Sequence, residues 1–333
     1  MVGFRFTGRA VALIAIAAAS LAGAGHAVAT PSYTLQSFAR DGVQTPGTFD
    51  DINASGTIVG QQPGWPAPLV TWSGGAMTEL PGGSKASAAF ISALGDVAAD
   101  VVDKDGNYVL VWFGGERRRV SDLANTSGIN AKRQVVGAEK GYIWPGMYDN
   151  GIYKRMASLN KHGAFPTAIN DQGVVVGFQR GDMGKARPAV WDADGTIRYL
   201  GSATKVGYGQ ADGINNAGHI VGCTDVLQCF LYDGAKYRRL PRVDGHKVTT
   251  VTGVSDDDVV LGRVYAHTFQ ADVISCPGAT YLLKALLGEE GTHWSEFVPT
   301  RISPSGSIIG RGVRDGESRS FVATMATPCD AAD

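Results

Sequence analysis

Residues 288–297 hold the side chains that are best suited to acid–base chemistry. The set is Glu289, Glu290, His293 and Glu296, which supply carboxyl groups and an imidazole. Glycosidic bond cleavage needs only two such groups brought to a set separation by folding. We therefore keep a polysaccharide hydrolase or lyase, in which acidic residues and His293 act together, as the alternative function.

Motifs of the common enzyme classes do not occur in the sequence. There is no G-x-S-x-G, no H-E-x-x-H, no G-x-x-x-x-G-K and no strand-to-helix dinucleotide fingerprint. No C-x-x-C pair or group of histidines indicates a metal site. We predict no catalytic residue, cofactor or metal from these patterns, and a non-enzymatic binding protein or scaffold is the favoured hypothesis.

Aromatic and cationic residues in variable segments suit recognition. Tryptophan in a loop can stack on a sugar ring or on a partner side chain, although tryptophan is more often buried against neighbouring structure. The variable segments are 61–66, 178–187, 202–210, 242–247, 288–297 and 312–319. From them we predict as ligand-binding residues Trp65, Trp294, His293, Tyr208 and Arg187.

A repeat of about 40 residues must position these side chains. Its marker is Ile or Val followed by Asn or Ser, and the intervals are 39, 38, 40, 45, 40 and 48 residues. The seven markers begin at Ile52, Ile91, Ile129, Ile169, Ile214, Val254 and Ile302. Glycine tends to follow four and eight places later, as at Gly56 and Gly60. Repeats of this length made of four short strands are typical of propeller blades.

Each unit carries the chemistry of two hairpins. Asn or Ser caps a turn, glycine takes the left-handed conformation, and β-branched residues continue as the second strand. The third strand usually carries or ends on an aromatic residue, and the fourth strand ends on a leucine. The aromatic residues are Trp72, Trp112, Trp144, Trp191 and Tyr232, and the leucines are Leu80, Leu123, Leu159, Leu200 and Leu240.

The seventh unit lacks a fourth strand, and residues 33–38 supply one. We therefore predict an all-β fold, a single seven-bladed β-propeller of four-stranded blades. The N-terminal strand 33–38 completes the last blade, so the ring is closed. In such blades, the loops after the second and fourth strands share one face. These loops are the variable ones, and we expect binding there. The enzyme alternative would instead act near the propeller axis.

The combined pattern of Ile-Asn, Gly, Ile/Val-Val-Gly, aromatic third strand and closing Leu resembles the HAF-repeat family of bacterial extracellular proteins over about residues 33–324. The nearest version of the His-Ala-Phe triplet is His267-Thr268-Phe269. The resemblance implies export and a repeat fold. It implies no reaction.

The first 29 residues read as a cleaved secretory signal peptide, followed by the propeller over residues 30–333. Arg5 and Arg9 precede an apolar run that ends at the small-residue site 27–29. We therefore expect a secreted or periplasmic monomer with no membrane span in the mature chain. Its partner is an unknown protein or glycan.

Four cysteines in an exported chain favour disulfides. Cys223 and Cys229 fall on consecutive strands joined by a short turn, which predicts a Cys223–Cys229 bridge and leaves Cys276–Cys329 as the second.

Basic residues recur on the predicted outer strands at 117–119, 154–155, 198 and 238–239. They either protect exposed strand edges or form a basic rim for an anionic glycan or lipid head group. Without residues 1–29, which contain Arg5 and Arg9, the chain has 28 Lys+Arg (30 minus 2) against 31 Asp+Glu. This balance argues against nucleic acid as a partner.

Overall fold

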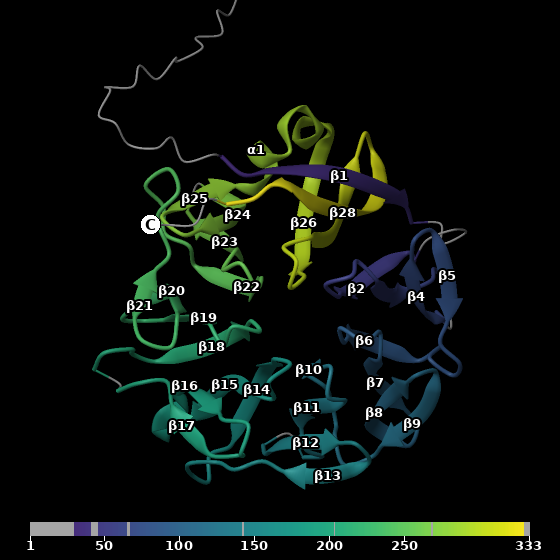
Figure 1. Ribbon diagram of the computed structural model, residues 1–333, viewed down its shortest axis with the longest axis vertical. Coiled ribbons are helices and arrows are strands. Elements are labelled where there is room, and N and C mark those ends of the chain that lie inside the picture. The colour runs from purple at the N-terminus through teal and green to yellow at the C-terminus, as the bar shows by residue number, and fades with distance from the viewer. Residues whose placement is uncertain are drawn as a thin grey trace, which may run out of the picture.

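The computed structural model describes residues 30–40, 46–64, 67–141, 143–202, 204–267 and 269–329. The predicted signal peptide, residues 1–29, and the predicted binding residue Trp65 lie outside them. Seven antiparallel sheets of four strands each are arranged in a ring (Figure 1). The fold is a seven-bladed β-propeller, as the repeat predicts.

Each blade runs from an inner first strand to an outer fourth strand. Blade one contains β2 (Thr48–Ile52), β3 (Ile58–Gln61), β4 (Leu69–Ser73) and β5 (Ala76–Glu79); blade two contains β6 (Ala86–Ile91), β7 (Val97–Asp103), β8 (Gly106–Phe113) and β9 (Glu116–Val120); blade three contains β10 (Gly128–Ile129), β11 (Gln134–Ala138), β12 (Pro145–Asp149) and β13 (Ile152–Arg155).

The later blades follow the same order. Blade four contains β14 (Ala164–Ile169), β15 (Val175–Arg180), β16 (Ala186–Trp191) and β17 (Ile197–Tyr199), with the 3-10 turn η1 (Asp182–Gly184); blade five contains β18 (Gly209–Ile214), β19 (Ile220–Thr224), β20 (Gln228–Tyr232) and β21 (Tyr237–Arg239); blade six contains β22 (Thr250–Val254), β23 (Val260–Ala266), β24 (Phe269–Cys276) and β25 (Ala279–Leu282). The link to blade seven holds α1 (Leu283–Leu286) and η2 (Gly288–His293).

Blade seven joins the two ends of the described chain. It contains β26 (Trp294–Ile302), β27 (Ile308–Arg314), β28 (Glu317–Thr327) and, as its outer strand, β1 (Ser32–Ala39). β1 lies along β28 in antiparallel register (Figure 1), with Leu35 opposite Ala323. The prediction that residues 33–38 close the ring is confirmed.

Two glycines of the repeat have different physical reasons. Gly56 has a φ of +81°, which the turn between the first two strands requires and which side chains disfavour. Gly60 sits where a Cβ atom would come within 1.9 Å of the carbonyl oxygen of Thr48 on the first strand. The first glycine therefore shapes the turn, and the second lets the two inner strands approach each other.

Both predicted disulfides are present. Cys223 and Cys229 are direct partners across β19 and β20, with Cα atoms 4.0 Å apart. Cys276 at the end of β24 is bonded to Cys329, which anchors the segment after β28 to blade six. In the described part of the chain, no helix is long and apolar enough to span a membrane.

Blade three departs from the predicted alignment. Trp144 was expected in the third strand, but it precedes β12, and Tyr148 takes the position opposite the second strand that Trp72 takes in blade one. The predictions that Leu159 and Leu123 close their fourth strands are wrong. Met156 makes the hydrogen bond to the carbonyl oxygen of Pro145 that is equivalent to the bond of Leu80, and in blade two β9 ends at Val120. Leu159 is 42% exposed in the link to blade four.

Candidate functional site

Exposed apolar side chains gather on one face of the propeller. This variable face is formed by the loops between second and third strands and by the links between blades. Six of the eight large hydrophobic residues that are exposed in the described chain lie there: Val102, Ile143, Leu159, Tyr208, Val226 and Tyr265. Leu94 and Ile152 lie in turns of the opposite face. A concentration of apolar surface on one face is typical of an interaction site.

Cations stacked on aromatic rings border the same face. The Arg187 guanidinium lies 3.7 Å from the ring centroid of Tyr199, and Nζ of Lys185 lies 4.5 Å from that of Tyr208. Similar pairs at the strand ends of this face are Arg119 with Tyr108, Arg155 with Trp144, Arg180 with Phe165, and Arg263 with Tyr265. Such pairs hold long side chains in place while leaving donor groups exposed.

Two of the predicted binding residues lie together at this face. Tyr208 and Arg187 flank the junction of blades four and five through their contacts with Lys185 and Tyr199. Arg187 also donates to the carbonyl oxygen of Gly201. His293 lies at blade seven, is 43% exposed and contacts Asp315 at 3.3 Å. Among the predicted binding residues that the structure describes, Tyr208 and Arg187 therefore lie at a different blade junction from His293 and do not form one site with it.

Trp294 is not available as a surface anchor. It begins β26, is 1% exposed and packs edge-on against Phe297 and Phe321. Trp294 is a core residue of blade seven, so its ring is not exposed for stacking on a sugar. A register shift between Trp294 and Glu296 interrupts the alternation of buried and exposed side chains along β26. The start of this strand is therefore not recognisable from the sequence pattern.

A pocket of about 270 Å³ occupies one end of the propeller axis. It is lined by the last residues of the inner strands and by the turns that follow them, so it lies at the end away from the variable face. Its charged lining residues are Asp51, Asp171, Asp212, Asp256 and Arg301. His293 precedes β26, whose opposite end supplies Arg301. The structure therefore does not bring His293 to the axis with these acids.

The asparagines of the repeat link neighbouring blades. Oδ1 of Asn170 accepts from the backbone of Val174 in its own turn, and Nδ2 donates to the carbonyl oxygen of Asn215 in the next blade at 3.0 Å. Asn53, Asn130 and Asn215 make the same pair of bonds. The bond within the turn is predictable from one repeat unit. The bond to the next blade is not, because it joins residues about 40 positions apart in the sequence.

Most of the axial carboxylates are already engaged. Asp171 accepts from the backbone N–H of Ala131, and Asp256 accepts from that of Asn216. Asp51 accepts from the N–H of Ile91. Each of these carboxylates thus holds a residue of an adjacent blade, which is a structural use of its charge.

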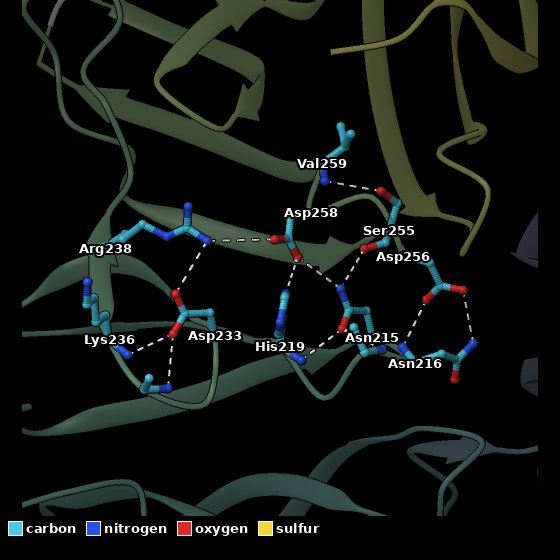
Figure 2. A network of polar contacts seen from close by, with 12 residues as sticks. Asn215, Asn216, His219, Asp233, Lys236, Arg238, Ser255, Asp256, Asp258 and Val259 are labelled. Atoms are coloured by element: carbon cyan, nitrogen blue, oxygen red, sulfur yellow. Dashed lines mark hydrogen bonds and ion pairs between the residues drawn. The ribbon is translucent and has the colours of Figure 1, made fainter. Parts of the chain in front are cut away.

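Figure 2 shows the most extensive of these links, between blades five and six. Asp258 accepts from Asn215 at 3.1 Å, contacts Nδ1 of His219 at 2.7 Å and lies 3.8 Å from Arg238. Asp258 takes the place of the first repeat glycine and keeps its positive φ of 60°. The variation at this position therefore preserves the backbone and adds an ion pair.

The same position carries the opposite charge in blade three. Arg133, with a φ of 61°, donates to Asp96 of blade two at 2.9 Å. Asp96 also accepts from the N–H of Gly114 at 2.7 Å, and its side chain is only 3% exposed. The two departures from the glycine pattern are thus equivalent bridges between blades.

Burial raises the pKa values of four carboxyl groups in the inner part of the ring, those of Asp50, Asp51, Asp100 and Asp212. Burial raises the pKa of Asp50 to about 7, and the nearby Asp51 adds to the shift while Arg301 opposes it. Burial also raises the pKa of Asp100 and of Asp212 to about 6. Asp212 lines the pocket and could exchange a proton with a ligand there, but its shift comes from burial and not from a second carboxylate.

The outer basic residues are largely neutralised by acids of their own blades. Arg118 pairs with Glu116, Arg155 with Glu139, Arg198 with Asp192, and Arg238 with Asp233. These pairs fit charged protection of exposed strand edges better than a continuous basic rim.

Solved structures with the same architecture share little sequence with this chain. The β-propeller domain of the trilobed protease from Pyrococcus furiosus superposes with a TM-score of 0.54 at 10% identity, over 90% of this chain and 100% of that one. Pyrococcus horikoshii acylaminoacyl peptidase superposes with a TM-score of 0.52 at 11% sequence identity, over 83% of this chain and 50% of that one. Virginiamycin B lyase from Staphylococcus aureus superposes with a TM-score of 0.50 at 11% sequence identity, over 88% of this chain and 99% of that one.

These similarities establish the propeller fold alone. The P. furiosus domain is described as having an open velcro topology, whereas β1 closes the ring here. No family model matches the sequence, and no curated protein matches it.

Proposed function

We propose that this protein is an exported binding propeller that recognises a protein or glycan through its variable face. The observation that carries the proposal is the gathering of exposed apolar side chains and stacked cations on that face over blades two to six. Aromatic rings and arginines are the side chains that dominate binding energy at interfaces.

Export, a secreted or periplasmic location and membership of the HAF-repeat family belong to the same proposal. They rest on the pattern of residues 1–29 and on the repeat. The two disulfides support an oxidising compartment.

Polysaccharide cleavage at the axis has weaker support. Asp51, Asp171 and Asp256 are bonded to neighbouring blades, and His293 lies at the other end of β26. Burial raises the pKa of Asp51 and of Asp212, and Asp212 accepts a hydrogen bond from Gln210 of its own strand. A cleavage mechanism needs a second group opposite it.

The proposal is tested with paired double variants on opposite faces. Replacing Tyr208 and Tyr265 by Ala removes two exposed rings from the variable face, while Leu94→Ala with Ile152→Ala removes two exposed apolar side chains from the other face. The ligands are those found on a glycan array or captured from envelope extracts. For these ligands we expect the first double variant to bind about tenfold more weakly or worse, and the second to bind like the wild type. Equal losses in both double variants would contradict the proposal.

A further inference from the structure

A groove at the junction of blades five and six is lined by three cations and no carboxylate. Arg239, Arg242 and Lys247 border a volume of about 390 Å³ together with Gln228 and Pro241. All three cationic side chains belong to exposed residues. Unlike the preceding Arg238, which pairs with Asp233 and Asp258, they form no ion pair with a carboxylate of the described chain.

The two guanidinium groups are held by backbone oxygens. Arg239 donates to the carbonyl oxygen of Val226 at 3.1 Å, and Arg242 donates to that of Gly245 at 2.7 Å. A guanidinium has five N–H donors, so each arginine is fixed by one bond and keeps donors for a ligand. Fixed guanidinium groups suit oxyanions, because two of their N–H groups can donate in parallel to two oxygens of one anionic group.

One wall of the groove is rigid. Gln228 has a φ of +62°, which is unfavourable for a side-chain-bearing residue. The adjacent Cys229 is bonded to Cys223 across the hairpin, and this bond constrains the loop between them. Strained backbone held by its surroundings is frequent at ligand sites, and a preformed wall lowers the entropy lost on binding.

One aromatic ring, that of Tyr208, lies beside the loop that borders the groove, on the side of blade four. The loop that receives Arg239 also holds Asp225, which accepts from the N–H of Tyr208 at 2.7 Å and donates its own N–H to the Tyr208 carbonyl oxygen at 2.9 Å. The ring of Tyr208 is stacked with Lys185. A chain of sugars leaving the groove along this loop would meet an aromatic ring and another cation.

We infer that this groove binds the anionic group of an acidic polysaccharide, with Tyr208 contacting a neighbouring sugar ring. The inference rests on the proposed function and names the ligand class for the variable face. The chemistry it uses is shared by carboxylate and sulfate groups on sugars. The formal charge of the whole chain, −1, argues against nucleic acid, which needs a broad positive surface.

The test measures binding of the purified protein to polygalacturonate, heparin and neutral dextran, with duplex DNA as a further probe. Arg239→Ala combined with Lys247→Ala should weaken binding of the anionic polysaccharide about tenfold or more. Raising the salt from about 0.05 M to about 0.5 M should weaken wild-type binding as well. The matched control is Arg118→Ala with Arg198→Ala, which removes two outer-strand arginines that are paired with acids.

The inference is supported if the groove variant loses binding to either anionic polysaccharide and the control variant keeps it. The polymer that the wild type prefers then shows whether the groove recognises carboxylate or sulfate groups. The inference is overturned if the protein binds dextran as tightly as the anionic polysaccharides, or if it binds DNA more tightly than it binds them. It is also overturned if neither anionic polysaccharide binds, or if the control variant loses as much binding as the groove variant. If only this inference fails, the variant without Tyr208 and Tyr265 still loses its partner. If the proposed function fails, that variant binds like the wild type.

Discussion

Phe38→Ala is expected to lower the free energy of unfolding by about 3–5 kcal/mol, the usual cost of truncating a buried phenylalanine. Phe38 lies on β1, is 9% exposed, and packs against Phe49 and Trp72 of blade one with ring centroids 5.7 and 5.1 Å away. β1 itself belongs to the sheet of blade seven. The ring of Phe38 therefore joins the last blade to the first.

Denaturant unfolding of the purified protein measures this effect. Gln36→Ala is the matched control, because Gln36 lies on the same strand, is exposed, and pairs through its backbone with Val322. Its effect should stay within about 0.5 kcal/mol. If Phe38→Ala is as mild as the control, β1 does not hold the ring closed.

The protein is expected to be less stable at pH ~8 than at pH ~5, by about 2–3 kcal/mol from Asp50 alone. Burial raises the pKa of Asp50 from 3.8 to about 7, and one of its carboxyl oxygens has no hydrogen-bond partner in the described chain. Between these two pKa values the folded state holds the proton and the unfolded state has lost it. The stability contributed by the protonated form is therefore full below the lower value and is lost as the pH rises through the higher one.

Unfolding measured across this pH range, with Asp50→Asn alongside, tests the assignment. The amide does not titrate, so the variant should have a flatter dependence. The remaining slope is due to the pKa values that burial raises at Asp51, Asp100, Asp212 and Asp272. Backbone hydrogen bonds lower the pKa of Asp103, Asp194 and Asp233, so these groups titrate below this pH range. Stability that rises from pH ~5 to ~8, or an unchanged slope in Asp50→Asn, contradicts the account.

Local chemistry made much of the architecture predictable. The turn asparagines, the glycines at Gly56 and Gly60, and the β-branched second strands identify a blade from about 40 residues of sequence. The missing strand of the last unit then points to residues 33–38, and hairpin geometry brings Cys223 opposite Cys229. These predictions depend on contacts within one repeat unit, or on the need of the last blade for a fourth strand.

Contacts between blades could not be read in the same way. The bond from Asn170 to Asn215 and the bridge from Asp96 to Arg133 join units whose relative rotation no single repeat specifies. The groove combines Gln228, Arg239 and Lys247, which lie in three separate stretches of chain. Its signal in the sequence is a set of cations at the end of an outer strand, Arg239, and in one variable segment, Arg242 and Lys247.

Hydrogen exchange with and without an acidic polysaccharide tests most directly whether recognition takes place on the variable face. We predict slower exchange on binding in residues 224–229 and 239–248, which form the groove, with no change in the axial turn at residues 215–218. Protection confined to that axial turn, with the groove unchanged, would place the ligand at the opposite end of the propeller and contradict the account.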